Sequence, residues 1–286
     1  MITNSSYRRQ NLMSKVYVIT GGSGGMGKQI ARRLGKRGTL LLADVSEERL
    51  SQAATELAAE GITDLKFRTV DITNVQQVEE LASEAAKLGE LGAVVHTAGL
   101  SPTMSTGRRI MEVNMVGTGL ILNAFLPLAV PGSVAVCISS MSAFFAPRHE
   151  SFVELLKNPL APDFLDRIEA FTQGKPEASY PISKIGVQVL VEEQAWAWGQ
   201  KGARIVSVSP GTIDTPMGRQ EAEQSAAMKL LLDNTPLGRE GEAGEIAGAV
   251  AFLVSEDASY ITGTDIRVDG GTVARVLSTG ALRKPQ

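Results

Sequence analysis

A tyrosine and a lysine stand four residues apart in the segment "SYPISK", Ser179 to Lys184. Residues i and i+4 of a helix lie on one face, one turn apart, so the Tyr180 hydroxyl and the Lys184 ammonium can converge on one point. Pro181 has no backbone N–H and is tolerated in a first turn, so we expect a helix that begins at or just after about Glu177. The pair could transfer a proton, although the same spacing also occurs on ordinary solvated helix faces.

A glycine-rich segment, "TGGSGGMG", follows the first apolar run and precedes the first amphipathic stretch. Glycines let a backbone pass close to a pyrophosphate, and a helix N-terminus offers N–H donors and a partial positive charge. A plain tight turn is the alternative, but the strand-to-helix context favours dinucleotide binding. The residues expected to contact the dinucleotide here are Gly21, Ser23, Gly24, Gly25, Met26 and Gly27.

Asp44 ends the second apolar run, where its carboxylate can accept hydrogen bonds from the adenosine ribose and would repel a 2′-phosphate. We therefore expect NAD as the cofactor in preference to NADP. An N-cap role is the alternative, but Ser46 fills it better. Asp71 could cap a helix beginning near Asn74 or contact adenine together with Ile72, and the sequence leaves both possibilities open.

Seven short apolar runs alternate with amphipathic stretches from Lys15 onward. Continuous apolar strands between helices are typical of a parallel sheet covered on both faces, so we predict a doubly wound, Rossmann-type α/β fold in a single domain. We expect a polar extension over residues 1–13, the domain over 14–276 and a tail over 277–286.

The composition limits the classes of function. The chain has 286 residues and a formal net charge of −3, which favours neither nucleic acid nor an anionic membrane surface as a partner. Cys137 is the only cysteine, which excludes an internal disulfide and fits a reducing compartment, so we expect a cytoplasmic protein. No apolar run reaches the roughly 18 residues of a membrane span, and "MITNSSYRRQNLM" lacks the apolar region of a secretory signal. His96 and His149 have no metal-ligand company, so we expect no metal.

Several motifs together carry a family resemblance: "TGGSGGMG", "HTAG" from His96, "VNMVGT", "ISSMSA", "YPISK", "VSPGTIDTPM" and "VDGG". Their order and places resemble those of the short-chain dehydrogenase/reductase family from about Lys15 to Val273. The resemblance implies a bound nicotinamide dinucleotide and hydride exchange between an alcohol and a carbonyl. It also assigns a catalytic tetrad, with Ser139 as the competitor for the serine role: Asn114, Ser140, Tyr180 and Lys184.

The chemistry implied for the tetrad is coherent. A phenol has a pKa near 10, and lowering it by about three units takes roughly 4 kcal/mol, which Lys184 and the positive nicotinamide ring can supply. Tyr180 would take the hydroxyl proton in oxidation, and Ser140 would hold the same oxygen. Asn114, at a kink in its helix, would anchor a water that relays protons to Lys184, which would also bind the nicotinamide ribose.

The resemblance implies further cofactor contacts. Ala98 and Gly99 are expected to line the cofactor site, whereas the nicotinamide end is expected to be shaped by Pro210, Gly211, Ile213 and Thr215. The family usually has asparagine where His96 stands, and we interpret His96 as a hydrogen-bonded core residue.

A long segment separates Ser140 from Tyr180, and its apolar residues at helical spacing predict a helical hairpin within about residues 146–176. This insertion resembles the bacterial 3α-hydroxysteroid dehydrogenase/carbonyl reductase subgroup. In that subgroup it blocks the helix-pairing interface of most relatives, which implies a homodimer through another face or another homo-oligomer.

The expected substrate is a small-molecule alcohol or ketone. An apolar wall would suit a hydrophobic, steroid-like or terpenoid-like molecule, although methionines are often ordinary core residues. The residues expected in that wall are Met104, Met141, Phe144, Phe145, Met217 and Met228. Two alternatives remain: a 3-oxoacyl-thioester reductase, which Asp44 disfavours because such enzymes usually take NADPH, and a non-catalytic dinucleotide-sensing protein, a class that typically lacks the tyrosine.

Overall fold

The computed structural model describes residues 14–216, 218–219 and 226–281. The predicted extension over residues 1–13 and the end of the predicted tail lie outside these residues, as does Met217. The predicted start of the tail at residue 277 falls inside a helix, α12, which spans Thr272–Thr279. Val273 and Val276, which precede the predicted boundary, are buried, whereas Leu277 just after it is 57% exposed. The buried part of the helix thus ends near the predicted boundary, and the helix itself continues past it to Thr279.

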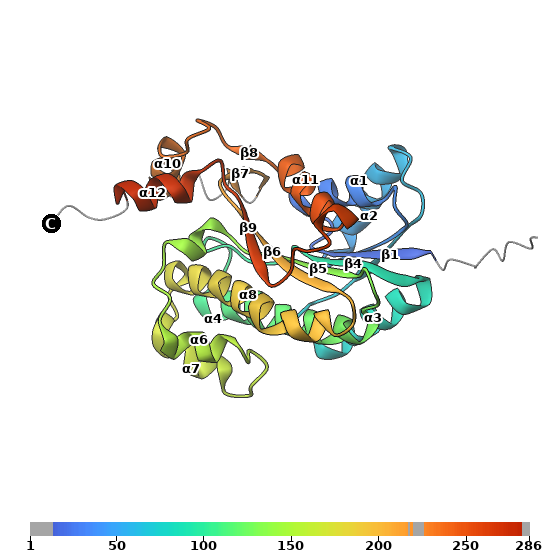
Figure 1. Ribbon diagram of the computed structural model, residues 1–286, viewed down its shortest axis with the longest axis horizontal. Helices are drawn as coiled ribbons and strands as arrows, with labels where there is room; N and C mark the ends of the chain where they lie inside the picture. Colours follow the sequence, from blue (N-terminus) through green and yellow to red (C-terminus); the bar gives the residue numbers. More distant parts are fainter. Residues whose placement is uncertain (1–13, 217, 220–225, 282–286) are drawn as a thin grey trace, which may run out of the picture.

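A seven-stranded sheet forms the centre of the molecule (Figure 1), in the order β3-β2-β1-β4-β5-β6-β9. Every neighbouring pair is parallel. Strands β2 and β3 are added on one side of β1 and the later strands on its other side, so the strand order switches between β1 and β4. This is the predicted doubly wound fold. Its strands are β1 Lys15–Thr20, β2 Thr39–Asp44, β3 Leu65–Thr69, β4 Glu90–His96, β5 Val134–Ile138, β6 Arg204–Pro210 and β9 Thr264–Val268.

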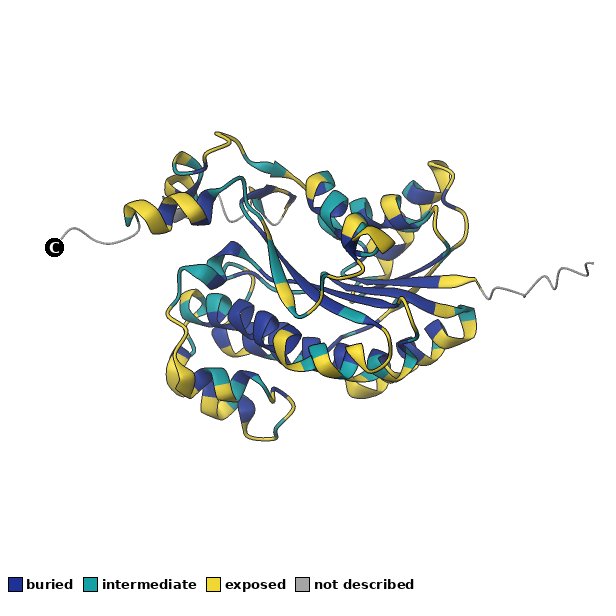
Figure 2. Ribbon diagram, viewed as in Figure 1, coloured by how far each residue is buried: buried dark blue, intermediate teal, exposed yellow. Residues whose placement is uncertain are grey.

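The five inner strands are mostly buried because helices cover both faces of the sheet (Figure 2), whereas the edge strands β3 and β9 carry charged side chains and are more exposed. Successive side chains of a strand point to opposite faces, so Val16 and Val18 of β1 enter one core while Tyr17 and Ile19 enter the other. One face is covered by α1 Gly25–Leu34, α2 Glu47–Ala59 and α11 Ala243–Leu253. The other is covered by α3 Val75–Leu88, α4 Gly107–Met111, α5 Thr118–Phe125 and α8 Pro176–Gly199.

The first turns of α2 and α3 show which residues are their N-caps. The side chain of Ser46 accepts a hydrogen bond from Arg49 N and caps α2, as expected, while Asn74 accepts one from Gln77 N and caps α3. Asp44 and Asp71 are therefore not N-caps of these helices.

The catalytic helix of the family pattern, α8, begins at Pro176 rather than at Glu177 or later. Pro181 consequently lies within the helix and not in its first turn. The carbonyl that Pro181 leaves without a helical donor belongs to Glu177, an exposed residue, so water can satisfy it.

The predicted helical hairpin is present as α6 Glu150–Leu156 and α7 Phe164–Thr172. These helices pack against each other and against α8, and α7 also contacts α4 (Figure 1). Phe152, Leu156, Phe164 and Ile168 are buried and join the core on that face, so the insertion is an integral part of the domain.

The remaining elements lie near the carboxyl ends of the strands. Strands β7 Ile213–Asp214 and β8 Gly241–Glu242 pair with each other, and helix α10 Ala226–Asp233 contacts α12 (Figure 1). Among the described residues, one stretch, Gly107–Leu128, is long and apolar enough to cross a membrane by composition alone. Because 67% of its apolar window is buried inside the protein, it is accounted for as a core element of this domain.

Candidate active site

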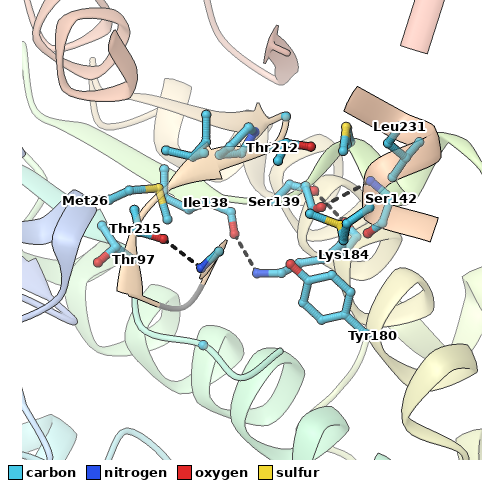
Figure 3. Close-up of a pocket in the computed structure, with 18 of the residues that line it drawn as sticks. Met26, Thr97, Ile138, Ser139, Ser142, Tyr180, Lys184, Thr212, Thr215 and Leu231 are labelled. Atoms are coloured by element: carbon cyan, nitrogen blue, oxygen red, sulfur yellow. Dashed lines mark hydrogen bonds between the residues drawn. The ribbon is translucent and has the colours of Figure 1, made fainter. Parts of the chain in front are cut away.

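A cavity of about 150 Å³ opens at the carboxyl ends of the central strands, where ligands bind in doubly wound folds (Figure 3). Three of the four predicted catalytic residues line it: Ser140, Tyr180 and Lys184. Of the predicted cofactor contacts, the other residues lining it are Met26, Gly99, Pro210, Gly211, Ile213 and Thr215.

Tyr180 and Lys184 lie one turn apart on α8, as the spacing predicted. The ammonium nitrogen of Lys184 is 5.6 Å from the centroid of the Tyr180 ring and donates a 3.0 Å hydrogen bond to the carbonyl oxygen of Ile138. Lys184 is only 7% exposed, so its charge acts in a poorly solvated environment beside the phenol.

The two serines after β5 have different surroundings. Ser139 is 2% exposed, and its hydroxyl donates a 2.8 Å hydrogen bond to the carbonyl oxygen of Lys184, which ties β5 to α8. Ser140 accepts a 3.1 Å hydrogen bond from Ser142 N, capping the short 3₁₀ helix Met141–Phe144, and keeps its own O–H as a donor. Ser140 is thus both a strand-end cap and a possible donor to a ligand in the cavity.

Asn114 lies behind the cavity and is 1% exposed. It belongs to a π-helical segment, Glu112–Gly117, which provides the expected kink between α4 and α5. Its side-chain oxygen accepts from Leu100 N (2.8 Å), and its amide nitrogen donates to Leu100 O and to Ser183 Oγ (both 3.0 Å). Asn114 therefore connects the loop after β4 to α8.

The glycine-rich loop fits the pyrophosphate of a dinucleotide. A Cβ on Gly21, whose φ is +66°, would stand 2.6 Å from Thr97 Oγ1, and a Cβ on Gly27 would stand 2.2 Å from the carbonyl oxygen of Gly21. A side chain at position 21 would therefore clash with Thr97, and one at position 27 would clash with the Gly21 carbonyl, so the loop can pack this tightly only with glycine at both positions. Helix α1 begins directly after Gly24, and its first turn carries no acidic side chain, so its partial positive charge is available to an anion.

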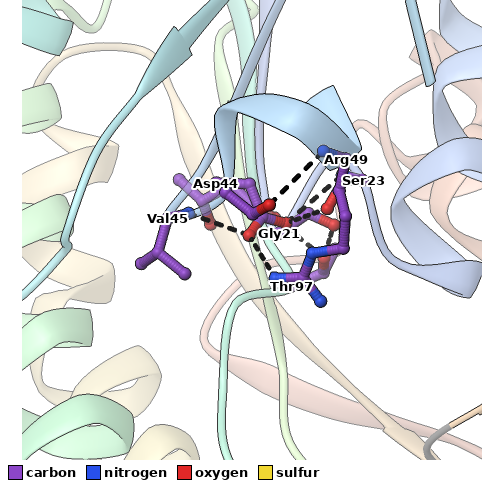
Figure 4. Close-up of polar contacts among 8 residues, drawn as sticks. Gly21, Ser23, Asp44, Val45, Arg49 and Thr97 are labelled. Carbon is purple, nitrogen blue, oxygen red and sulfur yellow. Dashed lines mark hydrogen bonds and ion pairs between the residues drawn. The ribbon is translucent and has the colours of Figure 1, made fainter. Parts of the chain in front are cut away.

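Asp44 lies at the end of β2 beside this loop (Figure 4). One carboxylate oxygen accepts hydrogen bonds from Ser23 Oγ (2.5 Å) and Ser23 N (3.4 Å). The other accepts from Val45 N (2.8 Å) and pairs with the Arg49 guanidinium (3.1 Å). Arg49 was not among the predicted site residues, although its position in the first turn after the Ser46 cap brings it back toward Asp44.

Asp71 and Ile72 do not lie among the described residues that line the cavity. Burial would raise the pKa of Asp71, but hydrogen bonds from Thr73 and the charge of Arg109 outweigh it and lower the pKa. Ile72 is 5% exposed and abuts Gly117, where a Cβ would stand 2.7 Å from its side chain. In the structure, Asp71 is thus held by Thr73 and Arg109, and Ile72 packs against Gly117.

Ala98 adjoins the glycine loop, since a Cβ on Gly21 would stand 2.8 Å from its backbone nitrogen. Ser23, Gly24 and Gly25 lie on the same loop, and Gly25 faces Thr215, whose side chain would be 3.1 Å from an added Cβ. These predicted cofactor residues do not line the cavity themselves, but their loop connects it to Asp44, since Gly25 faces the cavity residue Thr215 and Ser23 bonds to Asp44.

The predicted apolar wall is partly correct. Met141, Phe145 and Met228 line the cavity, but Met104 is 44% exposed and Phe144 packs under the Arg267 guanidinium at 5.2 Å. Met217 lies outside the described residues. Cavity residues that the sequence reading missed are Thr97, Leu100, Ile138, Ser142, Thr212, Gly218 and Leu231. Leu231 could have been found, because it follows Met228 by one helical turn.

His96 is 3% exposed, and burial together with the charge of Lys184 lowers its pKa to about 3. It bonds to two threonine hydroxyls, Thr20 at 2.7 Å and Thr118 at 3.0 Å, as expected of a satisfied core histidine. Within the described part of the chain, no group of three or more His, Cys, Asp or Glu side chains could hold a metal ion.

Two family models match the chain: "short chain dehydrogenase" over residues 15–152 and "Enoyl-(Acyl carrier protein) reductase" over residues 166–273. A short-chain dehydrogenase/reductase of Alternaria brassicicola, bsc3, is 35% identical over 92% of this chain and 97% of its own length. The 3-alpha-hydroxysteroid dehydrogenase/carbonyl reductase of Comamonas testosteroni is 30% identical over 76% of this chain and 88% of its own.

Solved structures agree with these matches. The 3-alpha-hydroxysteroid dehydrogenase from Pseudomonas sp. B-0831, solved with NADH, superposes with a TM-score of 0.74 at 25% identity. The superposition covers 93% of this chain and 99% of that one. Sequence motifs, fold and relatives over nearly the whole chain agree, and the protein belongs to the short-chain dehydrogenase/reductase family of oxidoreductases.

Proposed function

We propose that this oxidoreductase interconverts a secondary alcohol and a ketone by hydride transfer, with NAD(H) as its cofactor. The observation that carries the proposal is that Ser140, Tyr180 and Lys184 meet in one cavity, next to a glycine loop that fits a pyrophosphate. A sensor would have no need for this combination of a phenol, a buried ammonium and a hydroxyl donor around one space.

Each residue has a definite task in this proposal. A bound nicotinamide would supply the hydride acceptor for oxidation of the alcohol carbon and the hydride donor for reduction of the carbonyl. In oxidation, the Tyr180 oxygen takes the proton of the substrate hydroxyl, and in reduction it gives a proton back to the same oxygen. Ser140 donates a hydrogen bond to that oxygen, and the Lys184 charge favours the deprotonated form of the phenol.

We propose that Asn114 and Lys184 hold a water between them, through which protons reach Tyr180. The Asn114 Oδ1 and Lys184 Nζ atoms are 3.2 and 3.5 Å from the point where a Cβ on Gly99 would stand. Glycine at this position leaves room near that point for a water that contacts both groups. A bulky residue at position 99 would fill the space.

NAD is preferred over NADP in this proposal because the Asp44 carboxylate would repel a 2′-phosphate. Arg49 weakens that repulsion, since its guanidinium already pairs with Asp44 and is 59% exposed. The NADH complex of the hydroxysteroid dehydrogenase relative is consistent with the preference. The ratio of kcat/KM for NAD over NADP measures it directly.

The proposed substrate is hydrophobic, because Met141, Phe145, Met228 and Leu231 line the same cavity as the proposed catalytic residues. The hydroxysteroid dehydrogenase relatives also favour this class. The test is NADH formation at 340 nm from a panel of secondary alcohols that includes 3-hydroxysteroids, terpenoid alcohols and polyols. Turnover confined to polyols would overturn the proposed substrate class but not the proposed chemistry.

A second candidate, a reductase of 3-oxoacyl thioesters, is favoured by one observation, the family model described as an enoyl-(acyl carrier protein) reductase over residues 166–273. Oxidation of NADPH by a 3-oxoacyl thioester, at a rate above that of any alcohol with NAD, would establish this candidate instead. Asp44 argues against it for the reason given above.

We also propose a cytoplasmic homodimer or other homo-oligomer. The insertion helices α6 and α7 cover α8 and α7 contacts α4, so another face would have to pair. Light scattering of the purified protein gives the mass, and a monomer at micromolar concentration would overturn this proposal.

A further inference from the structure

His96 is the start of a chain of hydrogen bonds that ends at a predicted catalytic residue. Its Nε2 atom lies 3.0 Å from Thr118 Oγ1, and that hydroxyl donates a 2.6 Å hydrogen bond to the carbonyl oxygen of Asn114. A hydroxyl has one hydrogen, and a carbonyl can only accept, so the Thr118 hydrogen is committed to Asn114. His96 must therefore donate from Nε2–H, and its Nδ1 accepts from Thr20 Oγ1 at 2.7 Å.

The receiving end of this chain is the π-helical segment that carries Asn114. A threonine hydroxyl that bonds to the carbonyl four residues earlier often bends a helix, and Thr118 makes this bond where the π-helical segment meets α5. Beyond this carbonyl, the Asn114 amide holds both backbone groups of Leu100 and the hydroxyl of Ser183. That hydroxyl in turn donates a 2.7 Å hydrogen bond to the carbonyl of Tyr180.

We infer that His96 is a positioning residue: it holds the Thr118 hydroxyl on the Asn114 carbonyl and thereby fixes the turn that connects the Gly99–Leu100 loop to the helix bearing Tyr180 and Lys184. The rate measurements below rest on the proposed function. The inference itself concerns His96 and Thr118, which are buried and contact neither substrate nor cofactor in the proposal.

Imidazole suits this task better than the asparagine expected from the family. Its two nitrogens point away from each other and reach hydroxyls on β1 and α5 at once. An asparagine side chain ends one atom earlier and has no group at the position of Nε2. Among the described titratable groups, the charge of Lys184 on α8 acts on His96, and Cys137 pairs with it across β4 and β5. An ammonium cannot accept a hydrogen bond and a thiol accepts one only weakly, so the Thr118 oxygen is the better acceptor for Nε2–H.

The test compares Thr118→Val, which keeps the shape and removes the hydroxyl, with Thr39→Val as a matched control. Thr39 is a buried threonine whose hydroxyl bonds to Asp64 at the opposite end of the sheet. Thr118→Val should lower kcat about tenfold and move the acidic limb of the kcat/KM profile for alcohol oxidation upward by about half a pH unit or more. Thr39→Val should reduce the melting temperature to a similar extent and move neither quantity.

Three further variants make the test specific. His96→Phe should reproduce the Thr118→Val profile, and the double variant should be no worse than either single one, because both break one chain of bonds. Thr118→Ser, which restores the hydroxyl, should recover kcat to within about twofold of wild type. The inference is overturned if Thr118→Val behaves like Thr39→Val, or if the effects of His96→Phe and Thr118→Val add.

An NMR experiment that requires no enzymatic turnover tests this inference separately from the proposed function. The chain has two histidines, His96 and the exposed His149, so the imidazole nitrogens can be assigned by ¹⁵N NMR. Wild-type protein should show His96 as a neutral Nε2–H tautomer from pH 5 to pH 8. A proton on Nδ1 in that range would refute the inference, whereas absent turnover with the expected tautomer would refute the proposed function alone.

Discussion

The ammonium nitrogen of Lys184 donates a 3.0 Å hydrogen bond to the carbonyl oxygen of Ile138, the last residue of β5. In return, Ser139 donates a 2.8 Å bond to the Lys184 carbonyl. Helix α8 is thus held to the end of β5 at two points, directly before Ser140. The phenol, the ammonium and the serine hydroxyl consequently share one rigid frame.

Replacing Lys184 by methionine should lower kcat by about a hundredfold or more, because the charge that favours the deprotonated phenol is lost. Initial rates at saturating NAD and alcohol measure this. Lys201→Met is the control, since Lys201 is exposed just beyond the end of α8. A Lys184→Met enzyme with kcat within about threefold of wild type would contradict the role proposed for the lysine.

Replacing Asp44 by serine should move the preference from NAD toward NADP by about tenfold or more in the ratio of kcat/KM values. The carboxylate no longer repels a 2′-phosphate, and the Arg49 guanidinium, released from its 3.1 Å ion pair, can approach that phosphate. Asp44→Ser combined with Arg49→Gln should lose the gain with NADP. If the wild type already prefers NADP, the interpretation of Asp44 is wrong.

The fold, the glycine loop and the Tyr180–Lys184 pair could be predicted from local patterns, because apolar runs between amphipathic stretches specify a parallel sheet and an i, i+4 pair shares one helix face. Ser140 and the residues of the nicotinamide end were expected only from the family resemblance. Contacts between distant segments could not be predicted in this way. Asp71, for example, pairs with Arg109, which stands 38 residues later, and neither local pattern points to the other.

Two other differences have the same physical origin. Met104 was expected in the apolar wall, but the loop after β4 leaves it 44% exposed. The predicted boundary at residue 277 also divides helix α12, whose Val273 and Val276, on the domain side, form a buried cluster with Met141 and Leu231. This cluster supports the cavity wall from behind, and only the folded chain brings its members together.

The depressed pKa of His96 should make stability depend on pH. Its folded-state pKa is about 3, against an ordinary value of 6.5, so the unfolded chain binds a proton that the folded one does not. Stability contributed by neutral His96 is therefore present above pH 6.5 and lost as the pH falls toward 3, by on the order of 4 kcal/mol near pH 3.5. Urea unfolding at several pH values should show a flatter acid dependence for His96→Phe than for wild type. Parallel curves would contradict the assigned pKa.

Cys137 should be unreactive in the native protein. It is fully buried in β5, and burial raises the pKa of its thiol to about 12, so almost no thiolate exists at pH 8. Because it is the only cysteine, its reaction with an aromatic disulfide reagent should proceed at the rate of unfolding and be complete in denaturant. Rapid labelling of the native protein would show that β5 is more accessible than described.

The most direct test of the proposed chemistry is the rate of NADH formation by wild type and Tyr180→Phe, measured with one accepted alcohol and with NAD binding monitored by fluorescence. The phenylalanine variant keeps the ring and removes the oxygen that takes the proton. We predict a loss of about a thousandfold in kcat, with NAD affinity retained to within about tenfold. A Tyr180→Phe enzyme that turns over at a rate comparable to wild type would contradict the proposal that Tyr180 transfers the proton.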